Sequence, residues 1–150
     1  MVPSMEPGGA PPPVPTASSA GWILVCDDTA SIRLLMRINL ELAGFEVLEA
    51  TDGRAGLQLL DRNLDRLPVV VILDAQMSPL DGWGAVAQIR ANPSLAHLPV
   101  VMVTASLQQQ EKERSIAAGV DAFVAKPFEP EDLVDLVSQL ATSGRPTAPP

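Results

Sequence analysis

Short apolar runs alternate along this chain with longer segments of helical periodicity. Four of the five runs contain no charged residue, which is typical of strands buried on both faces of a parallel sheet. The run at 45–50 alternates instead, with Glu46 and Glu49 among apolar residues, so we expect it at or near a sheet edge. The predicted strands are WILVC (22–26), FEVLEA (45–50), VVVIL (69–73), VVMVT (100–104) and AFVA (122–125).

The segments between these runs have the spacing of amphipathic helices. The clearest pattern lies in 130–140, where apolar residues recur at positions i, i+3, i+4 and i+7. Gly44 is placed to end the first helix, and Asp52 is placed to cap the second. Strict alternation of strands and helices predicts an α/β fold, a doubly wound parallel sheet of five strands. The predicted helices span 29–43, 53–62, 82–91, 107–118 and 130–140.

Composition separates a folded part from the two ends of the chain. With 47% hydrophobic residues in 150, most of the chain should fold around one core. Six of the 15 prolines lie in residues 1–20 and three in 142–150, among Gly, Ala, Ser and Thr. We therefore predict one domain over 21–141, between disordered proline-rich tails at 1–20 and 142–150.

Charge and rare residues exclude several classes of function. The chain has 10 basic and 18 acidic residues, and a net charge of −8 argues against direct binding to nucleic acid. One cysteine, Cys26, and one histidine, His97, exclude a disulfide framework and a Cys- or His-rich metal site. The N-terminus lacks a signal-peptide pattern, and no wholly apolar run approaches the ~20 residues that cross a bilayer. We expect a cytoplasmic protein that does not contact membranes.

Five polar residues fall at or just after the ends of the predicted strands. Asp27 and Asp28 follow the first strand, and Asp74 follows the third. Thr104 closes the fourth strand, and Lys126 follows the fifth. In open α/β sheets, ligands bind in the crevice at the carboxyl ends of the strands. We therefore expect these side chains to form one site.

The chemistry of this set points to phosphoryl transfer. Three carboxylates in one crevice repel each other, and an all-oxygen ligand set that needs a counter-charge suits Mg²⁺. Lys126 would add a compact positive charge. A carboxylate nucleophile, a hard cation, a hydroxyl and an ammonium together favour phosphoryl transfer, in which the protein mainly positions groups and neutralises charge.

The chain resembles a known family, the receiver domain of two-component response regulators. The resemblance covers about 21–141 and rests on ILVCDD, ILDAQMSPLDG, VVMVTA and DAFVAKPF, in the family's order and at close to its spacings. It implies a flavodoxin-like sheet with strand order 2-1-3-4-5, an order that receiver proteins share. That order would place the first and third strands side by side, so that Asp28 and Asp74 meet.

The resemblance also implies a role for each site residue. Asp74 would accept a phosphoryl group from a sensor histidine kinase, a phosphotransfer protein or a small donor such as acetyl phosphate. Asp28 would bind Mg²⁺ directly, Asp27 largely through a metal-bound water, and Gln76 through its backbone carbonyl. Catalysis would be limited to the protein's own phosphorylation and dephosphorylation.

Three further residues complete the implied set. Thr104 and Lys126 would contact the phosphoryl oxygens, and Phe123 would turn inward as Thr104 moves. The Lys126–Pro127 peptide bond is expected to be cis, as in the family. One position departs from the family pattern: Ser78 stands where proline is usual, and Pro79 comes one residue later.

Other interpretations stay open at this stage. Asp27 and Asp28 could be an N-cap pair for the following helix, and Asp74 a simple strand end. A pseudo-receiver would bind partners without phosphorylation. A Mg²⁺-dependent phosphatase would often carry a second acid two residues after its nucleophile, where this chain has Gln76. Our leading hypothesis is a single-domain phosphorylation switch that acts by binding an unknown downstream protein or by phosphorelay. Trp83 is interpreted as a packing residue.

Overall fold

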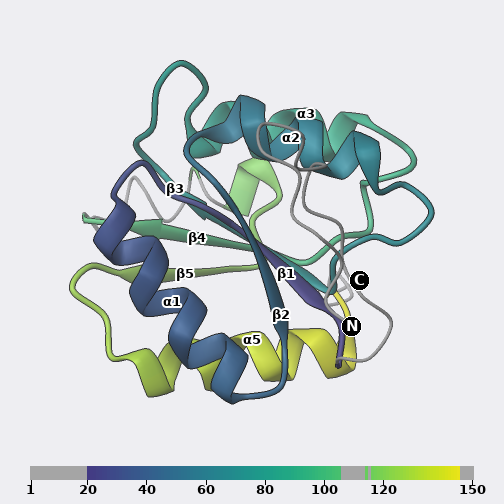
Figure 1. Ribbon diagram of the computed structural model, residues 1–150. Helices are drawn as coiled ribbons and strands as arrows, with labels where there is room; N and C mark the ends of the chain where they lie inside the picture. Colours follow the sequence, from purple (N-terminus) through teal and green to yellow (C-terminus); the bar gives the residue numbers. More distant parts are fainter. Residues whose placement is uncertain (1–19, 106–113, 115, 146–150) are drawn as a thin grey trace, which may run out of the picture.

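A computed structural model describes residues 20–105, 114 and 116–145. Five parallel strands form one sheet in the order β2-β1-β3-β4-β5, which confirms the flavodoxin-like topology (Figure 1). In Figure 1, α2 and α3 lie on one side of the sheet and α1 and α5 on the other. The elements are β1 (Trp22–Cys26), α1 (Ala30–Leu42), β2 (Glu46–Ala50), α2 (Gly53–Arg62), β3 (Val70–Asp74), α3 (Gly82–Ala91), β4 (Val100–Thr104), β5 (Ala122–Ala125) and α5 (Pro130–Ser143).

The strands are apolar on both faces because each face is covered by helices. Along β1, Trp22, Leu24 and Cys26 pack in a core with α2 and α3. The intervening residues Ile23 and Val25 pack in a second core with α1 and α5. All five residues are 0–1% exposed, so a charge at any of them would be buried. The predicted edge strand is β2, which pairs only with β1 among the described strands.

Most element boundaries agree with the predictions, with two corrections. Strand β3 includes Asp74 as its last residue, so the carboxylate ends the strand instead of following it. Helix α5 continues to Ser143, so the predicted domain end at 141 falls within a helix. The Thr142 hydroxyl donates to the Ser138 carbonyl at 3.0 Å, and the helix ends at Gly144 with φ of 74°.

Parts of the predictions fall outside the described residues. The predicted helix at 107–118 is described only at Arg114 and 116–118, which are helical. Residues 1–19 and 146–150 of the predicted tails are outside as well. No helix in the described part of the chain is long and apolar enough to cross a membrane.

A buried ion network closes the end of the sheet opposite the carboxyl ends of the strands. Arg90, at the end of α3, donates to Asp121 at 2.9 Å, and its side chain is 13% exposed. The same guanidinium satisfies three backbone carbonyls, those of Ala96, Leu98 and Gly119. Asp121 also accepts the backbone N–H of Val100 and the guanidinium of Arg145. This network joins α3, the loop before β4 and the start of β5.

We expect Arg90→Leu to lower the free energy of unfolding by about 3 kcal/mol. The substitution keeps apolar volume but removes the donor from three carbonyls and from a carboxylate that is 5% exposed. Urea unfolding followed by circular dichroism would measure the loss. The matched control is Arg62→Leu, an exposed arginine in the last turn of α2, which should change stability by less than about 0.5 kcal/mol. Equal losses in the two variants would contradict a structural role for the network.

Candidate active site

The sheet brings the two acidic segments together at the carboxyl ends of β1 and β3. These strands are hydrogen-bonded neighbours, and their register sets Cys26 opposite Leu73. The next residues, Asp27 and Asp74, therefore emerge side by side. Carboxylate oxygens of Asp27, Asp28 and Asp74 all lie within 4.8 Å of one another. Asp27 is fully buried, Asp74 is 6% exposed, and Asp28 is exposed.

Lys126 reaches this cluster from the end of β5. Thr104 pairs with Ala125 in the sheet, and the Lys126 backbone N–H donates to the Thr104 carbonyl at 2.8 Å. The Lys126 ammonium lies 3.0 Å from Asp27 Oδ2 and 3.2 Å from Asp74 Oδ2. One cation thus bridges two carboxylates, although β4 separates β5 from β3 in the sheet. The Lys126–Pro127 peptide bond is cis, as expected.

The electrostatics of the cluster follow from burial and from its three charges. Burial raises the pKa of the Asp74 carboxyl above its ordinary value. The Gln76 backbone N–H and Lys126 favour the ionised form, while the charge of Asp27 disfavours it. Burial lowers the pKa of Lys126, but hydrogen bonds and charge from Asp27 and Asp74 outweigh it, so that this pKa is raised. At neutral pH the Lys126 ammonium is therefore charged, and it lies between the Asp27 and Asp74 carboxyl groups.

Asp27 and Asp28 are not the N-cap pair of α1 that one interpretation of the sequence allowed. The N-cap of α1 is Thr29, whose side chain makes no capping hydrogen bond. Asp27 Oδ1 accepts the Thr29 backbone N–H at 2.8 Å, and the Asp27 carbonyl accepts from Arg33 at 2.6 Å. Asp27 is thus held rigidly from two sides, while Asp28 faces solvent.

The loop after β3 is closely packed where α3 begins. A Cβ on Gly82 would collide with the Asp74 carbonyl oxygen and would lie 2.6 Å from Met102 Sδ. Only glycine therefore lets the start of α3 lie this close to Asp74. Asp81 caps α3 by accepting the Gly84 N–H at 2.8 Å. The Ser78–Pro79 peptide bond is cis, and the structure does not account for serine at 78.

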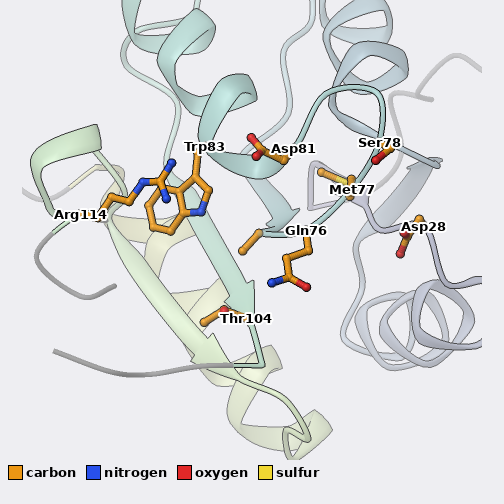
Figure 2. Close-up of a pocket in the computed structure, with 9 residues that line it drawn as sticks. Asp28, Gln76, Met77, Ser78, Asp81, Trp83, Thr104 and Arg114 are labelled. Atoms are coloured by element: carbon orange, nitrogen blue, oxygen red, sulfur yellow. The ribbon is translucent and has the colours of Figure 1, made fainter. Parts of the chain in front are cut away.

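Two adjoining cavities open at this edge of the sheet. The first, which we call the Asp74 cavity, has a volume of about 270 Å³ and is lined by Asp28, Thr29, Asp74, Gln76, Ala105 and Lys126. The second, which we call the side cavity, has about 440 Å³ (Figure 2). It is lined by Asp28, Ala75, Gln76, Met77, Ser78, Asp81, Trp83, Thr104 and Arg114.

The structure places the remaining predicted residues at different distances from this centre. Thr104 ends β4, is 8% exposed and lines the side cavity. Gln76 lines both cavities, and its backbone N–H donates to Asp74 Oδ1 at 3.3 Å. Phe123 lies inside β5 and packs against the core under α2 and α3. Its predicted role as a switch remains a prediction.

Trp83 and Arg114 are site residues that the sequence interpretation missed. The Arg114 guanidinium lies over the Trp83 ring, 4.4 Å from its centroid. Figure 2 shows the two side chains stacked at one end of the side cavity. Trp83 opens α3 only nine positions after Asp74, which is the sole sequence signal that places it near the site. Nothing in the spacing of Arg114 predicts this contact.

Comparison with known proteins decides the family. A model of the protein family described as "Response regulator receiver domain" matches residues 23–138. The chain belongs to the response regulator receiver domain family. The match begins at the second residue of β1, covers the other four strands and ends within α5, so it spans nearly the whole sheet of this receiver domain.

Two relatives are transcriptional regulators of greater length. The receiver domain is 35% identical over 118 residues to the DNA-binding dual master transcriptional regulator RpaA of Synechocystis, covering 79% of this chain and 48% of RpaA. It is 32% identical over 127 residues to the phosphate regulon transcriptional regulatory protein PhoB of Rhizobium meliloti, covering 83% and 53%. The chain thus spans about half the length of these relatives.

Among solved structures, the chemotaxis response regulator CheY4 of Vibrio cholerae has the same fold. The TM-score is 0.74 at 29% sequence identity, and the alignment covers 80% of this chain and 98% of CheY4. The receiver domain of the Francisella response regulator 1452 aligns with a TM-score of 0.75 at 26% identity, covering 81% and 97%.

Proposed function

We propose that this receiver domain accepts a phosphoryl group on Asp74 in a Mg²⁺-dependent reaction. The observation that carries the proposal is the position of Asp74. Its carboxylate lies in an open cavity, 3.2 Å from the Lys126 ammonium and within 4.8 Å of two further carboxylates. Sensor histidine kinases and phosphotransfer proteins are the donors we propose.

The residues at this edge fit a hard divalent cation. The donor set is all oxygen, and its negative charge exceeds the single positive charge of Lys126. Asp28 and Asp74 would hold Mg²⁺ directly, together with the Gln76 carbonyl. Both oxygens of Asp27 already accept hydrogen bonds, from Thr29 and Lys126, which suits contact through a water. When bound, Mg²⁺ supplies positive charge that offsets the charge on the phosphoryl oxygens.

The transfer itself needs few protein groups. An Asp74 oxygen attacks phosphorus, and the bond from phosphorus to the donor's nitrogen or oxygen breaks with its electron pair going to the leaving group. The Lys126 ammonium, anchored by Asp27, offers remaining N–H bonds to a phosphoryl oxygen. The Thr104 residue lies at the end of β4, next to β3, where its hydroxyl can contact a second phosphoryl oxygen.

We further propose that phosphorylation changes binding to a protein partner. Thr104 and Phe123 lie on adjacent strands, so a movement of Thr104 toward a phosphoryl group acts on the strand that carries Phe123. The relatives named above are transcriptional regulators, which makes gene regulation one route by which such a switch could act. The downstream partner in this proposal is a protein surface, because the net charge of −8 disfavours direct contact with nucleic acid.

Intact-mass measurement tests the proposal. The protein should gain one phosphoryl group with acetyl phosphate and Mg²⁺, and none when EDTA replaces Mg²⁺. Absence of an adduct with Mg²⁺ and excess donor would favour a pseudo-receiver that binds partners without phosphorylation. Rapid turnover of varied phosphate esters, measured as released phosphate, would instead favour a phosphatase.

A further inference from the structure

Glu49 in β2 is one of two acids that interrupt the apolar pattern of this edge strand, and it has no part in the phosphoryl transfer described above. Its carboxylate faces α1, where it accepts Arg33 Nε at 3.0 Å and Arg37 Nη1 at 2.8 Å. Ion pairs at partly exposed positions contribute little to stability. What the two arginines contact besides Glu49 therefore decides what this acid does.

Arg33 differs from Arg37 in reaching the loop that carries the acidic pair. Its Nη1 donates to the Asp27 backbone carbonyl at 2.6 Å, while Glu49 holds its Nε. The Arg33 side chain is 16% exposed, compared with 44% for Arg37. A planar guanidinium held at two of its N–H groups is fixed in direction. Arg33 thus links β2 to the peptide bond that joins Asp27 to Asp28.

Both sides of the Asp27 backbone are tied to the edge strand. The Asp27 N–H donates to the Ala50 carbonyl at 3.1 Å. The Asp27 carbonyl is held through Arg33 by Glu49, the residue next to Ala50. Asp27 is fully buried, so no water competes for these two backbone groups. The end of β2 therefore sets the position of the loop after β1.

Asp28 depends on this arrangement more than Asp27 does. Asp28 is exposed, and the one side-chain hydrogen bond that the described residues give it comes from the Thr29 hydroxyl at 3.4 Å. Its nitrogen lies in the same planar peptide unit as the carbonyl that Arg33 holds. Fixing that oxygen fixes the direction in which the Asp28 residue leaves the strand, on the side of the cluster shared with Asp74.

We propose that Arg33, supported by Glu49, is a positioning residue for the divalent-cation site. It holds the peptide between Asp27 and Asp28 so that the Asp28 carboxylate meets the cation with little reordering. The inference rests on the proposed function, because it concerns the support behind the same Mg²⁺ site. Arg33 does not contact the cation, and its own positive charge opposes one, so its contribution comes through the backbone.

Magnesium affinity tests this role. Arg33→Met keeps the apolar stem and removes both hydrogen bonds, so the Kd for Mg²⁺, measured by isothermal titration of the unphosphorylated protein, should rise about tenfold. Charge alone predicts the opposite sign, because removing a cation near three carboxylates favours an incoming cation. Phosphorylation by acetyl phosphate should slow at low Mg²⁺ and return to within about threefold of the unaltered rate at saturating Mg²⁺.

Two further variants separate positioning from charge and from folding. Arg37→Met removes the same charge and another partner of Glu49 without touching Asp27, and it should change the Kd for Mg²⁺ by less than about twofold. Arg33→Lys, which keeps the charge but not the planar fork, should bind Mg²⁺ about threefold more weakly than the unaltered protein. Urea unfolding in EDTA shows which variants are folded, and Arg33→Lys carries the test if Arg33→Met is not.

The outcomes distinguish this role from the proposed function. If Arg33→Met bound Mg²⁺ as tightly as the unaltered protein, or more tightly, the positioning role would be overturned while the proposed function stood. Equal losses in Arg33→Met and Arg37→Met would also overturn it, because the contact with Asp27 would then not matter. If the unaltered protein neither bound Mg²⁺ nor gained a phosphoryl group, the proposed function would fail, and the positioning role with it.

Discussion

Asp74→Asn should gain no phosphoryl group from acetyl phosphate and Mg²⁺ under conditions that label the unaltered protein completely. The amide has the shape of the carboxylate but lacks the anionic oxygen that attacks phosphorus, so the expected loss is complete on the scale of an intact-mass spectrum. The matched control is Asp135→Asn, an exposed aspartate on α5, which should be labelled normally. An adduct that persists in Asp74→Asn would show that another side chain is the acceptor.

Unfolding of the metal-free proteins shows whether the asparagine variant is intact. Burial raises the pKa of Asp74, so the folded state favours the protonated carboxyl. Between the unfolded and folded pKa values the folded protein binds more protons, and the stability that comes from the protonated form is lost as the pH rises through this window. At neutral pH the ionised carboxylate therefore weakens the metal-free fold. In EDTA at pH 7, Asp74→Asn should unfold at a midpoint no lower than that of the unaltered protein.

Lys126→Met should reduce the phosphorylation rate by about two to three orders of magnitude, because it removes a preorganised cation from the attacking carboxylate and from the phosphoryl oxygens. The same change leaves Asp27, which is fully buried, without its ion-pair partner. Breaking a buried pair costs about 3 kcal/mol, which urea unfolding in EDTA would measure. Because its neighbours raise the pKa of Lys126, the unaltered ion pairs should weaken only at strongly alkaline pH.

We expect Lys126→Met to bind Mg²⁺ more tightly than the unaltered protein, although its phosphorylation is slower. The ammonium occupies the carboxylate cluster and repels an incoming cation, so its removal should tighten Mg²⁺ binding while the reaction slows. Isothermal titration with Mg²⁺ would measure the affinity, and Lys126→Arg, which keeps the charge, should not show the tightening. Weaker Mg²⁺ binding in Lys126→Met would mean that lysine organises the cluster more than it competes with the metal.

The local elements were largely predictable because the forces that form them act over short stretches. The runs at 22–26 and 100–104 are strands with the predicted bounds, since uncharged runs of five residues can be buried on both sheet faces. Asp52 caps α2 as predicted because an N-cap requires only an acceptor side chain next to the first helical turn. The end of α5 was missed because the apolar periodicity stops at Leu140, whereas the last turn of the helix before Gly144 ends in the polar residues Thr142 and Ser143.

The carboxylate cluster could be predicted as a set but not as a geometry. Parallel strands end at one edge of a sheet, so residues at their carboxyl ends share that edge whatever the strand order. The family resemblance supplied the order that makes β1 and β3 neighbours, and the structure confirms it.

Contacts across the sheet and between distant loops needed the tertiary structure. Lys126 meets Asp27 across 99 residues of chain, and Arg90 meets Asp121 across 31. Such pairs depend on how far a side chain reaches past an intervening strand and on where two loops come to rest, and no local pattern encodes either. The same holds for Arg114, whose helical segment has no feature that directs it to Trp83.

The element types, the two-sided burial of the sheet and the edge at which the acidic residues gather can thus be inferred from residue order, because alternation, capping and strand direction are local or near-local properties. The folded chain was needed to show which cation faces which carboxylate, how Gly82 admits the start of α3 beside Asp74, and that a second cavity with a stacked arginine adjoins the Asp74 cavity. Those outcomes follow from the packing of segments far apart in the chain, where distances of a few ångströms are set by the whole fold.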